Sequence, residues 1–391
     1  MAVPPDLVDF GTSAVPNTVG FGSPLQMDSY RDFWTGVLSQ PWNIGEIRNR
    51  VREVWAPIRQ SYGQMSAVLT ELTEGADLIV VNTTGFDVQA ANIAEYRGIP
   101  LVVIHTIPGR PNGQLMPFLP APVARAAMQT NDWMSRGGYA RDAEKAQRAS
   151  LGLPKAGGSW PQRVVKSGAL EIQAYDAACF PGLAAEWEQW GDRRPVVGGL
   201  TMELPTPADD EILSWMAAGQ APIFFGFGSM PIESPADTLA MIAGACAQVG
   251  QRALVSTAGI DFSSVPEYEH VKVIGVVNFP AIFPACRAIV HHGGAGTTAL
   301  GLRAGMPTLI LSTDGLQALW GSQLKRLKVG TGRRFSQTTE ATLAADLRTI
   351  LDPAYLQAVR ELSTKMAQPA ESVALAADLV ETFARSPRVP R

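Results

Sequence analysis

Short apolar runs rich in β-branched residues recur along the chain, and each ends in a small or polar residue followed by a helical pattern. Runs of this kind lie at 78–81, 101–104, 223–225, 253–256, 288–290 and 308–311. Apolar strands that alternate with helices are typical of parallel sheets covered by helices on their faces. The sequence therefore predicts an α/β fold, and its 391 residues suit two such domains.

A stretch rich in Gly and Pro, PVVGGLTMELPTP at 195–207, separates the two sets of runs, and no helix could persist in it. We expect an N-terminal domain at 1–197, a linker at 198–208, a C-terminal domain at 209–370, and a C-terminal helix and tail at 371–391. The last helix has apolar residues at near-helical spacing, so it should pack on a core, which either domain could supply.

Composition excludes several classes of protein. The net charge of −4 and the absence of any Lys/Arg run argue against nucleic acid as a partner. Cys179, Cys246 and Cys286 lie far apart without CxxC spacing, so neither a metal site nor a disulfide framework is expected. Because no signal peptide and no apolar run of ~20 residues is found, we expect a cytoplasmic protein, and peripheral membrane contact stays open.

The segment HHGGAGTT at 291–298 is the sharpest local signal, because it joins a strand to a helix through small residues. At such a turn the amides of Gly294, Ala295, Gly296 and Thr297 have no partner within the helix, and together with the helix dipole they favour an anion such as a diphosphate. The glycine spacing is not GxGxxG, which disfavours a dinucleotide fold.

Three side chains of this segment could assist. His292 could donate a hydrogen bond to a phosphate oxygen, and Thr297 and Thr298 could donate from their hydroxyls while capping the helix. The alternative is a core histidine beside a plain helix cap, and the density of small residues favours the anion site over it. Ser229 ends another strand in the run GFGSM, so it could face the same ligand from a neighbouring strand of the sheet.

These residues resemble a known family. HHGGAGTT, followed by GLRAGMP at 301–307, is similar to the donor signature of the UDP-glycosyltransferase superfamily, and most similar to the bacterial branch that acts on glycopeptide antibiotics, glycopeptidolipids and sterols. The runs GFGSM, VVNFP at 276–280 and QALW at 317–320 follow in that family's order, so the resemblance spans most of 195–385. The resemblance implies a GT-B fold, in which two Rossmann-like domains face a cleft.

The family pattern also implies site roles. His292, Gly293 and the amides from Gly294 to Thr297 would hold the donor diphosphate, with Ser229 beside it. Val277 and Asn278 would lie beside the nucleobase, and Gln317 would reach the sugar hydroxyls. A turn between elements and an exposed helix residue are the alternatives for these last positions.

Two positions depart from the family pattern. The family has an Asp directly before this Gln, whereas here Leu316 stands there and Asp314 is the nearest acid. A sugar hydroxyl facing Leu316 would lose a hydrogen bond, which costs about 1–3 kcal/mol and favours a deoxysugar. The family's first strand and the loop with the acceptor base have no counterpart at the start of this chain. We expect a truncated front segment, an incomplete N-terminal domain and an unidentified base; the alternative is a protein that works without that loop.

The resemblance implies an inverting hexosyltransferase that uses neither metal nor cofactor and moves a sugar from a UDP- or dTDP-sugar to a hydroxyl of a lipid, glycopeptide or other small molecule. His105 follows the run at 101–104 and is a candidate base, although a buried structural histidine is the stronger interpretation. Two other functions remain open: a nucleotide-sugar-binding protein without activity, and a nucleotide-sugar epimerase.

Overall fold

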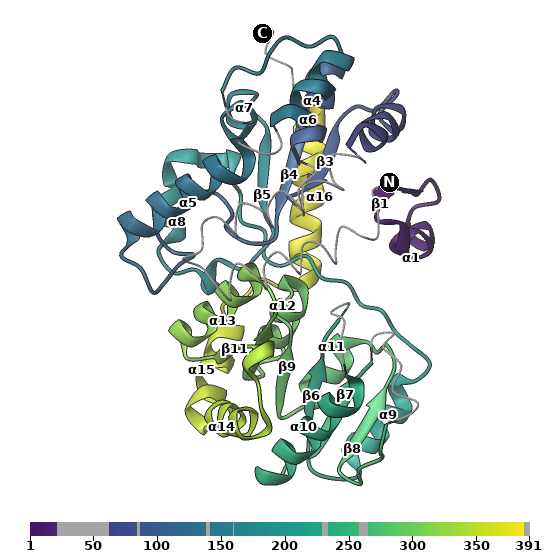
Figure 1. Cartoon of the computed structure of the whole chain (residues 1–391), viewed down its shortest axis with the longest axis vertical. Coiled ribbons are helices and arrows are strands. Elements are labelled where there is room, and N and C mark those ends of the chain that lie inside the picture. The colour runs from purple at the N-terminus through teal and green to yellow at the C-terminus, as the bar shows by residue number, and fades with distance from the viewer. Residues whose placement is uncertain are drawn as a thin grey trace.

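The computed structural model describes residues 1–21, 62–83, 87–137, 141–158, 160–228, 234–257 and 265–386. The chain forms two α/β units, each built on a sheet of parallel strands. The N-terminal unit lies at the top of Figure 1 and the C-terminal unit below it. The expected fold class, an α/β chain with two Rossmann-like units, is confirmed.

The C-terminal unit is a six-stranded parallel sheet in the order β11-β10-β9-β6-β7-β8. Its strands are β6 (Ile223–Gly226), β7 (Ala253–Ser256), β8 (Val271–Ile274), β9 (Ala288–His291), β10 (Thr308–Ser312) and β11 (Gly330–Arg334). Its helices are α9 (Asp209–Ala217), α10 (Pro235–Gln248), α11 (Phe279–Ile282), α12 (Ala295–Arg303), α13 (Gly315–Leu327), α14 (Glu340–Ile350) and α15 (Pro353–Ser363). The central strands are fully buried because helices cover both faces, which explains their unbroken apolar runs.

The strand order contains a topological switch point. From β6 the chain winds outward through β7 and β8, and it then returns to β9 and winds the other way through β10 and β11. The two central strands pair directly, with Gly226 opposite His291. Ligands of open α/β sheets bind outside the carboxyl ends of the strands at such a point.

The N-terminal unit has a three-stranded parallel sheet in the order β3-β4-β5. Its elements are β3 (Ile79–Asn82), α4 (Asp87–Arg97), β4 (Leu101–His105), α5 (Ala121–Gly137), α6 (Arg141–Ser150), α7 (Trp160–Lys166), β5 (Leu170–Gln173) and α8 (Leu183–Trp187). Ile93, Val103 and Val164 lie in the core on one face of this sheet. All six runs predicted as strands are strands, within a residue at either end.

The start of the chain carries a small sheet of its own. Strand β1 (Ala2–Val3) pairs in parallel with β2 (Val19–Gly20) across helix α1 (Val8–Ala14). No strand is predicted there, because two residues beside Pro4 are too few to show a periodic pattern.

Helix α16 (Pro369–Arg385) leaves the C-terminal unit and returns to the N-terminal sheet (Figure 1). Ala376, Leu379, Val380 and Phe383 pack against the buried side chain of Ile172 and its neighbours on β4 and β5. The apolar stripe of the last helix therefore packs on the N-terminal domain, which the sequence left undecided.

Candidate functional site

The loop between β9 and α12 lies at the switch point of the C-terminal sheet. Gly294 is the N-cap of α12 and provides no side-chain cap, and the helix begins at Ala295. Among the described residues, no acceptor is found for the amides of Gly294, Ala295, Gly296 and Thr297, and Gly296 is exposed. Unpaired amides at the positive end of a helix form an anion site.

His291 holds the backbone of this loop, a role that the sequence did not predict. Its Nδ1 atom accepts a hydrogen bond of 3.0 Å from the amide of Gly293, whose φ of 102° lies in the left-handed region. Burial, and then the neighbouring His292, hold the pKa of His291 well below its usual value, so the ring is neutral and can accept. The signal that could have predicted this role is a histidine two residues before a glycine in a tight turn, where the ring can accept from the glycine amide.

His292 lies between the ends of β6 and β9. A Cβ atom added to Gly228 would stand 2.8 Å from its Cε1 atom, and one added to Gly294 would stand 2.7 Å from its Nε2 atom. Burial lowers the pKa of His292, and a hydrogen bond to the backbone of Gly226 partly opposes this shift. Nδ1 is buried without a partner in the described part of the chain.

This geometry refines the role expected of His292. One nitrogen bonds Gly226, so the neutral ring presents the lone pair of Nδ1, and donation to a phosphate oxygen requires protonation of the ring. Ser229 lies outside the described residues. Its contact with the ligand stays a prediction.

The two threonines of the loop differ from the expectation. Thr298 is fully buried, and its hydroxyl donates a 2.8 Å hydrogen bond to the carbonyl of Gly294, so it serves the helix and not a ligand. Thr297 is half-buried in the first turn. Neither threonine caps the helix, because the N-cap position belongs to Gly294.

The start of α13 lies against this loop. A Cβ atom added to Gly293 would stand 3.0 Å from the Cβ of Gln317. Asp314 is the N-cap and accepts a 2.8 Å hydrogen bond from the amide of Gln317. The side-chain Oε1 of Gln317 accepts from the amide of Thr313 at 2.7 Å and from its hydroxyl at 3.1 Å, so Nε2 is the polar atom left to meet a ligand. Leu316 beside it is 43% exposed.

The two residues predicted to lie beside the nucleobase, Val277 and Asn278, are both buried. Val277 is buried in the core of the C-terminal unit, on one face of its sheet. Asn278 is also buried; its amide donates to Asp209 at 3.0 Å and its Oδ1 accepts from the amide of Leu204 at 3.1 Å. The exposed side chain at this position is that of Val276, which the sequence analysis did not single out.

Known proteins similar to this chain extend over almost its whole length. Residues 244–382 match the family of the erythromycin biosynthesis protein CIII-like C-terminal domain. An uncharacterized glycosyltransferase of Mycobacterium leprae (strain TN) is 52% identical over 381 residues, which cover 97% of this chain and 89% of that protein. The chain belongs to the GT-B UDP-glycosyltransferase superfamily. It is a glycosyltransferase, as expected from the residues around His292.

More distant glycosyltransferases share the same architecture. A sterol 3-beta-glucosyltransferase of Arabidopsis thaliana is 28% identical over 374 residues, covering 91% of this chain and 58% of that protein. The crystal structure of the glycosyltransferase VinC in complex with dTDP superposes with a TM-score of 0.60 at 17% identity, covering 98% of this chain and 92% of that one. The GT-B fold is therefore shared where sequence identity is low.

His105 of this glycosyltransferase is a buried residue in a charged cluster. Its Nε2 lies 3.0 Å from Oε2 of Glu171, which also accepts from Arg110 Nε at 2.5 Å, and Arg194 Nε lies 3.3 Å from Oε1. Burial raises the pKa of Glu171, but the hydrogen bond with His105 and the two guanidinium groups outweigh it and lower the pKa to about 2. Burial also lowers the pKa of His105. The structural interpretation of His105 fits this geometry better than the role of acceptor base.

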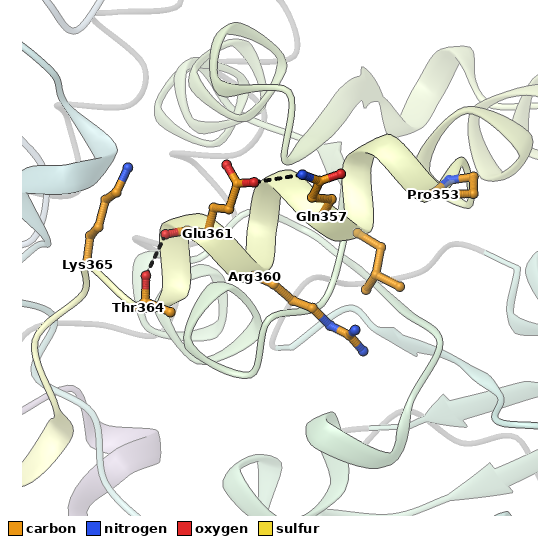
Figure 2. A pocket seen from close by; sticks show the side chains of 7 residues that line it. Pro353, Gln357, Arg360, Glu361, Thr364 and Lys365 are labelled. Carbon is orange, nitrogen blue, oxygen red and sulfur yellow. Dashed lines mark hydrogen bonds between the residues drawn. The ribbon is translucent and has the colours of Figure 1, made fainter.

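A surface hollow of about 590 Å³ lies along α15 of the glycosyltransferase, where Gln357 donates to Glu361 at 2.9 Å (Figure 2). One helix and the two residues after it supply all of its lining side chains, and none comes from the loop at His292. The hollow is therefore separate from the loop at His292. Among the described helices, none is long and apolar enough to cross a membrane.

Proposed function

We propose that this glycosyltransferase is an inverting enzyme that uses neither metal nor cofactor. It transfers a sugar from a UDP- or dTDP-sugar to a hydroxyl of a lipid, glycopeptide or other small molecule, in the cytoplasm. The observation that carries this proposal is the row of unpaired amides from Gly294 to Thr297 at the switch point of the C-terminal sheet. They lie where two phosphates of a donor would meet the positive end of α12.

The geometry matches the chemical need of the leaving group. As the acceptor oxygen bonds to the anomeric carbon, the bond from that carbon to the diphosphate breaks and negative charge grows on the diphosphate. Amides that are oriented before the reaction stabilise this charge without reorganisation, and losing one such donor typically costs ~10²–10³ in rate. The acceptor proton leaves to a base that we do not assign among the described residues.

The sugar subsite favours a donor that lacks a hydroxyl at one position. Gln317 offers only its Nε2 donor, because Thr313 occupies its Oε1, and Leu316 next to it offers no polar atom. A buried hydroxyl facing Leu316 would stay unpaired, so we propose a deoxysugar. The dTDP bound by VinC supports testing dTDP as the donor nucleotide. The sterol named for the plant relative supports a lipid as the acceptor.

The experiment is a donor and acceptor panel. Thermal shifts are measured with UDP, dTDP and GDP and with their sugars, because a ligand at ~100 times its Kd adds about 2.7 kcal/mol of stability. Release of UDP or dTDP only when a hydroxylic acceptor is present supports the proposal. Donor binding with no release under any condition would indicate a binding protein, and conversion of the sugar without an acceptor would indicate an epimerase.

A further inference from the structure

Arg303 ends the helix whose first turn carries the unpaired amides. Its guanidinium donates from Nη1 to the carbonyl of Gly199 at 2.9 Å and to the hydroxyl of Thr201 at 3.1 Å, and from Nη2 to the hydroxyl of Ser372 at 3.3 Å. Nη2 also lies 3.4 Å from Oδ2 of Asp176; the Asp176 side chain is buried, and that of Arg303 is 9% exposed. One side chain of the donor helix therefore contacts the linker, α16 and the N-terminal unit.

Asp176 binds the linker and the segment before α16 through its carboxylate. It follows β5 by three residues, and it is buried. Its Oδ2 accepts from the amide of Gly199 at 3.2 Å, and its Oδ1 accepts from the amide of Ala367, just before α16, at 2.8 Å. The carboxylate thus holds the backbone of both chain segments that pass between the two units.

The linker is pressed against the donor helix at this point. A Cβ atom added to Gly199 would stand 2.9 Å from the Cβ of Ala299 on α12. Gly198 has a φ of 85°, and a Cβ atom there would stand 2.8 Å from the Cβ of Ala367. Glycine is required at both positions, so the close approach of linker and helix is part of the fold.

We propose that Asp176 and Arg303 are positioning residues that fix α12, and with it the donor, relative to the N-terminal unit. The inference rests on the proposed function, in which the first turn of α12 holds the donor diphosphate. Arg303 lies eight residues beyond Ala295, so the two ends of this rigid helix are about 12 Å apart. Anchoring one end aligns the other, and a misplacement of about 1 Å can cost 10²-fold in rate.

The experiment separates positioning from folding. Arg303→Gln, Asp176→Asn and the control Arg385→Gln, which removes an exposed ion pair with Glu381, are compared well below their unfolding temperatures. For the two test variants we expect kcat to fall by about 10- to 100-fold. The Kd for UDP should stay within about twofold, since the amides lie far from the substitution. Unchanged kcat, or a loss of UDP affinity equal to the loss of kcat, would overturn the proposal.

Arg303→Lys tests the planar guanidinium group. Arg303→Lys keeps the charge beside Asp176 but cannot reach the linker and Ser372 together, so we expect kcat well below the wild-type value. Wild-type kcat in this variant would overturn the role given to the guanidinium.

A second readout does not depend on catalysis. Spin labels at the exposed positions Lys145 on α6 and Gln357 on α15 report the distance between the two units. Arg303→Gln should broaden or shift the distribution, whereas Arg385→Gln should leave it unchanged. An identical distribution in Arg303→Gln would overturn the proposal. If the wild type transfers no sugar at all, the proposed function fails and the distance measurement still decides the positioning role.

Discussion

Gly293 lies directly against Gln317, so that a Cβ atom at Gly293 would stand 3.0 Å from the Cβ and 3.2 Å from the Cα of Gln317. The same atom would stand 2.8 Å from Cγ2 of Ile310. The starts of α12 and α13 therefore meet without space for a side chain between them. The two segments proposed to hold the diphosphate and the sugar are therefore in direct contact with each other.

The substitution Gly293→Ala tests this packing. The new methyl group would clash with Gln317 and Ile310, and the φ of 102° would be strained in any residue with a Cβ atom. We expect the free energy of unfolding to fall by about 1–3 kcal/mol in denaturant titrations. Gly296→Ala is the matched control, because a Cβ atom there meets nothing within 4 Å. Equal stability of the two variants would contradict the packing described.

The pH dependence of nucleotide binding tests His292. Burial lowers the pKa of His292 in the free protein, so the ring is neutral at pH 7 and cannot donate from Nδ1. A bound diphosphate should raise this pKa, because an opposite charge favours the protonated ring. Affinity for UDP should then increase as the pH falls from 8 toward the pKa of the free protein.

Calorimetry of UDP with wild type and His292→Gln between pH 8 and 5.5 checks the sign. The titration of UDP itself contributes equally to both proteins, so the difference between the two curves reports the histidine. We expect a shallower slope in His292→Gln. Two superimposable curves would show that the ring does not take up a proton on binding.

Glu171 makes acid stability a test of the buried cluster. Its pKa in the folded protein is about 2 against a reference value of 4.5, so the carboxylate stabilises the fold above that reference value. This stabilisation is lost as the pH falls from 4.5 toward 2. Glu171→Gln should remove that pH dependence.

At pH 7 the same variant should cost about 3–5 kcal/mol, because Arg110 and Arg194 lose their buried partner. Unfolding free energies measured from pH 7 to pH 3 check both points, with Glu381→Gln at an exposed pair as the control. A slope in Glu171→Gln equal to that of the wild type would refute the role assigned to the carboxylate.

The sequence predicts those parts of the fold that have strong local patterns. The apolar strands β4, β7 and β10 follow from their β-branched runs, since both faces are buried. Strands β5 and β11 gave no such signal, because Glu171 and Gln173 interrupt the first and Gly330 and Arg333 the second. Tertiary pairing decides these strands, and no local pattern contains that information.

The site shows the same division. The small residues from Gly293 to Gly296 predict an anion-binding loop, because a glycine-rich turn before a helix can be recognised from neighbouring residues alone. The hydrogen bond from Gly293 to His291 and the use of the Thr298 hydroxyl by Gly294 depend on the path of the backbone. Contacts such as that of Asp176 with Arg303 join residues separated by 127 positions, and no local sequence pattern predicts such a pair.

Leu316 tests the proposed donor preference. Leu316→Asp places an acceptor beside Gln317, where the sugar hydroxyls are expected, so UDP-glucose should gain relative to a dTDP-deoxysugar. A recovered hydrogen bond of about 1–3 kcal/mol corresponds to a change of roughly 5- to 150-fold in the ratio of kcat/KM values. A wild-type enzyme that strongly prefers UDP-glucose would refute the preference.

The most direct test of the amide site removes one amide and nothing else. Gly294 has φ −59° and ψ 137°, a conformation that suits the residue before a proline, and position 295 opens the helix, where proline is tolerated. Ala295→Pro therefore deletes one N–H group without disturbing α12, and Ala295→Ser keeps it. Thermal unfolding of both variants is measured first, to establish that each is folded.

The decisive measurement is the Kd for UDP and dTDP of Ala295→Pro and Ala295→Ser by isothermal titration calorimetry. If the amides hold the diphosphate, the proline variant should bind the preferred nucleotide at least about tenfold more weakly, since a hydrogen bond to a charged group contributes about 1.5–3 kcal/mol. Equal affinity of the two folded variants would contradict the account.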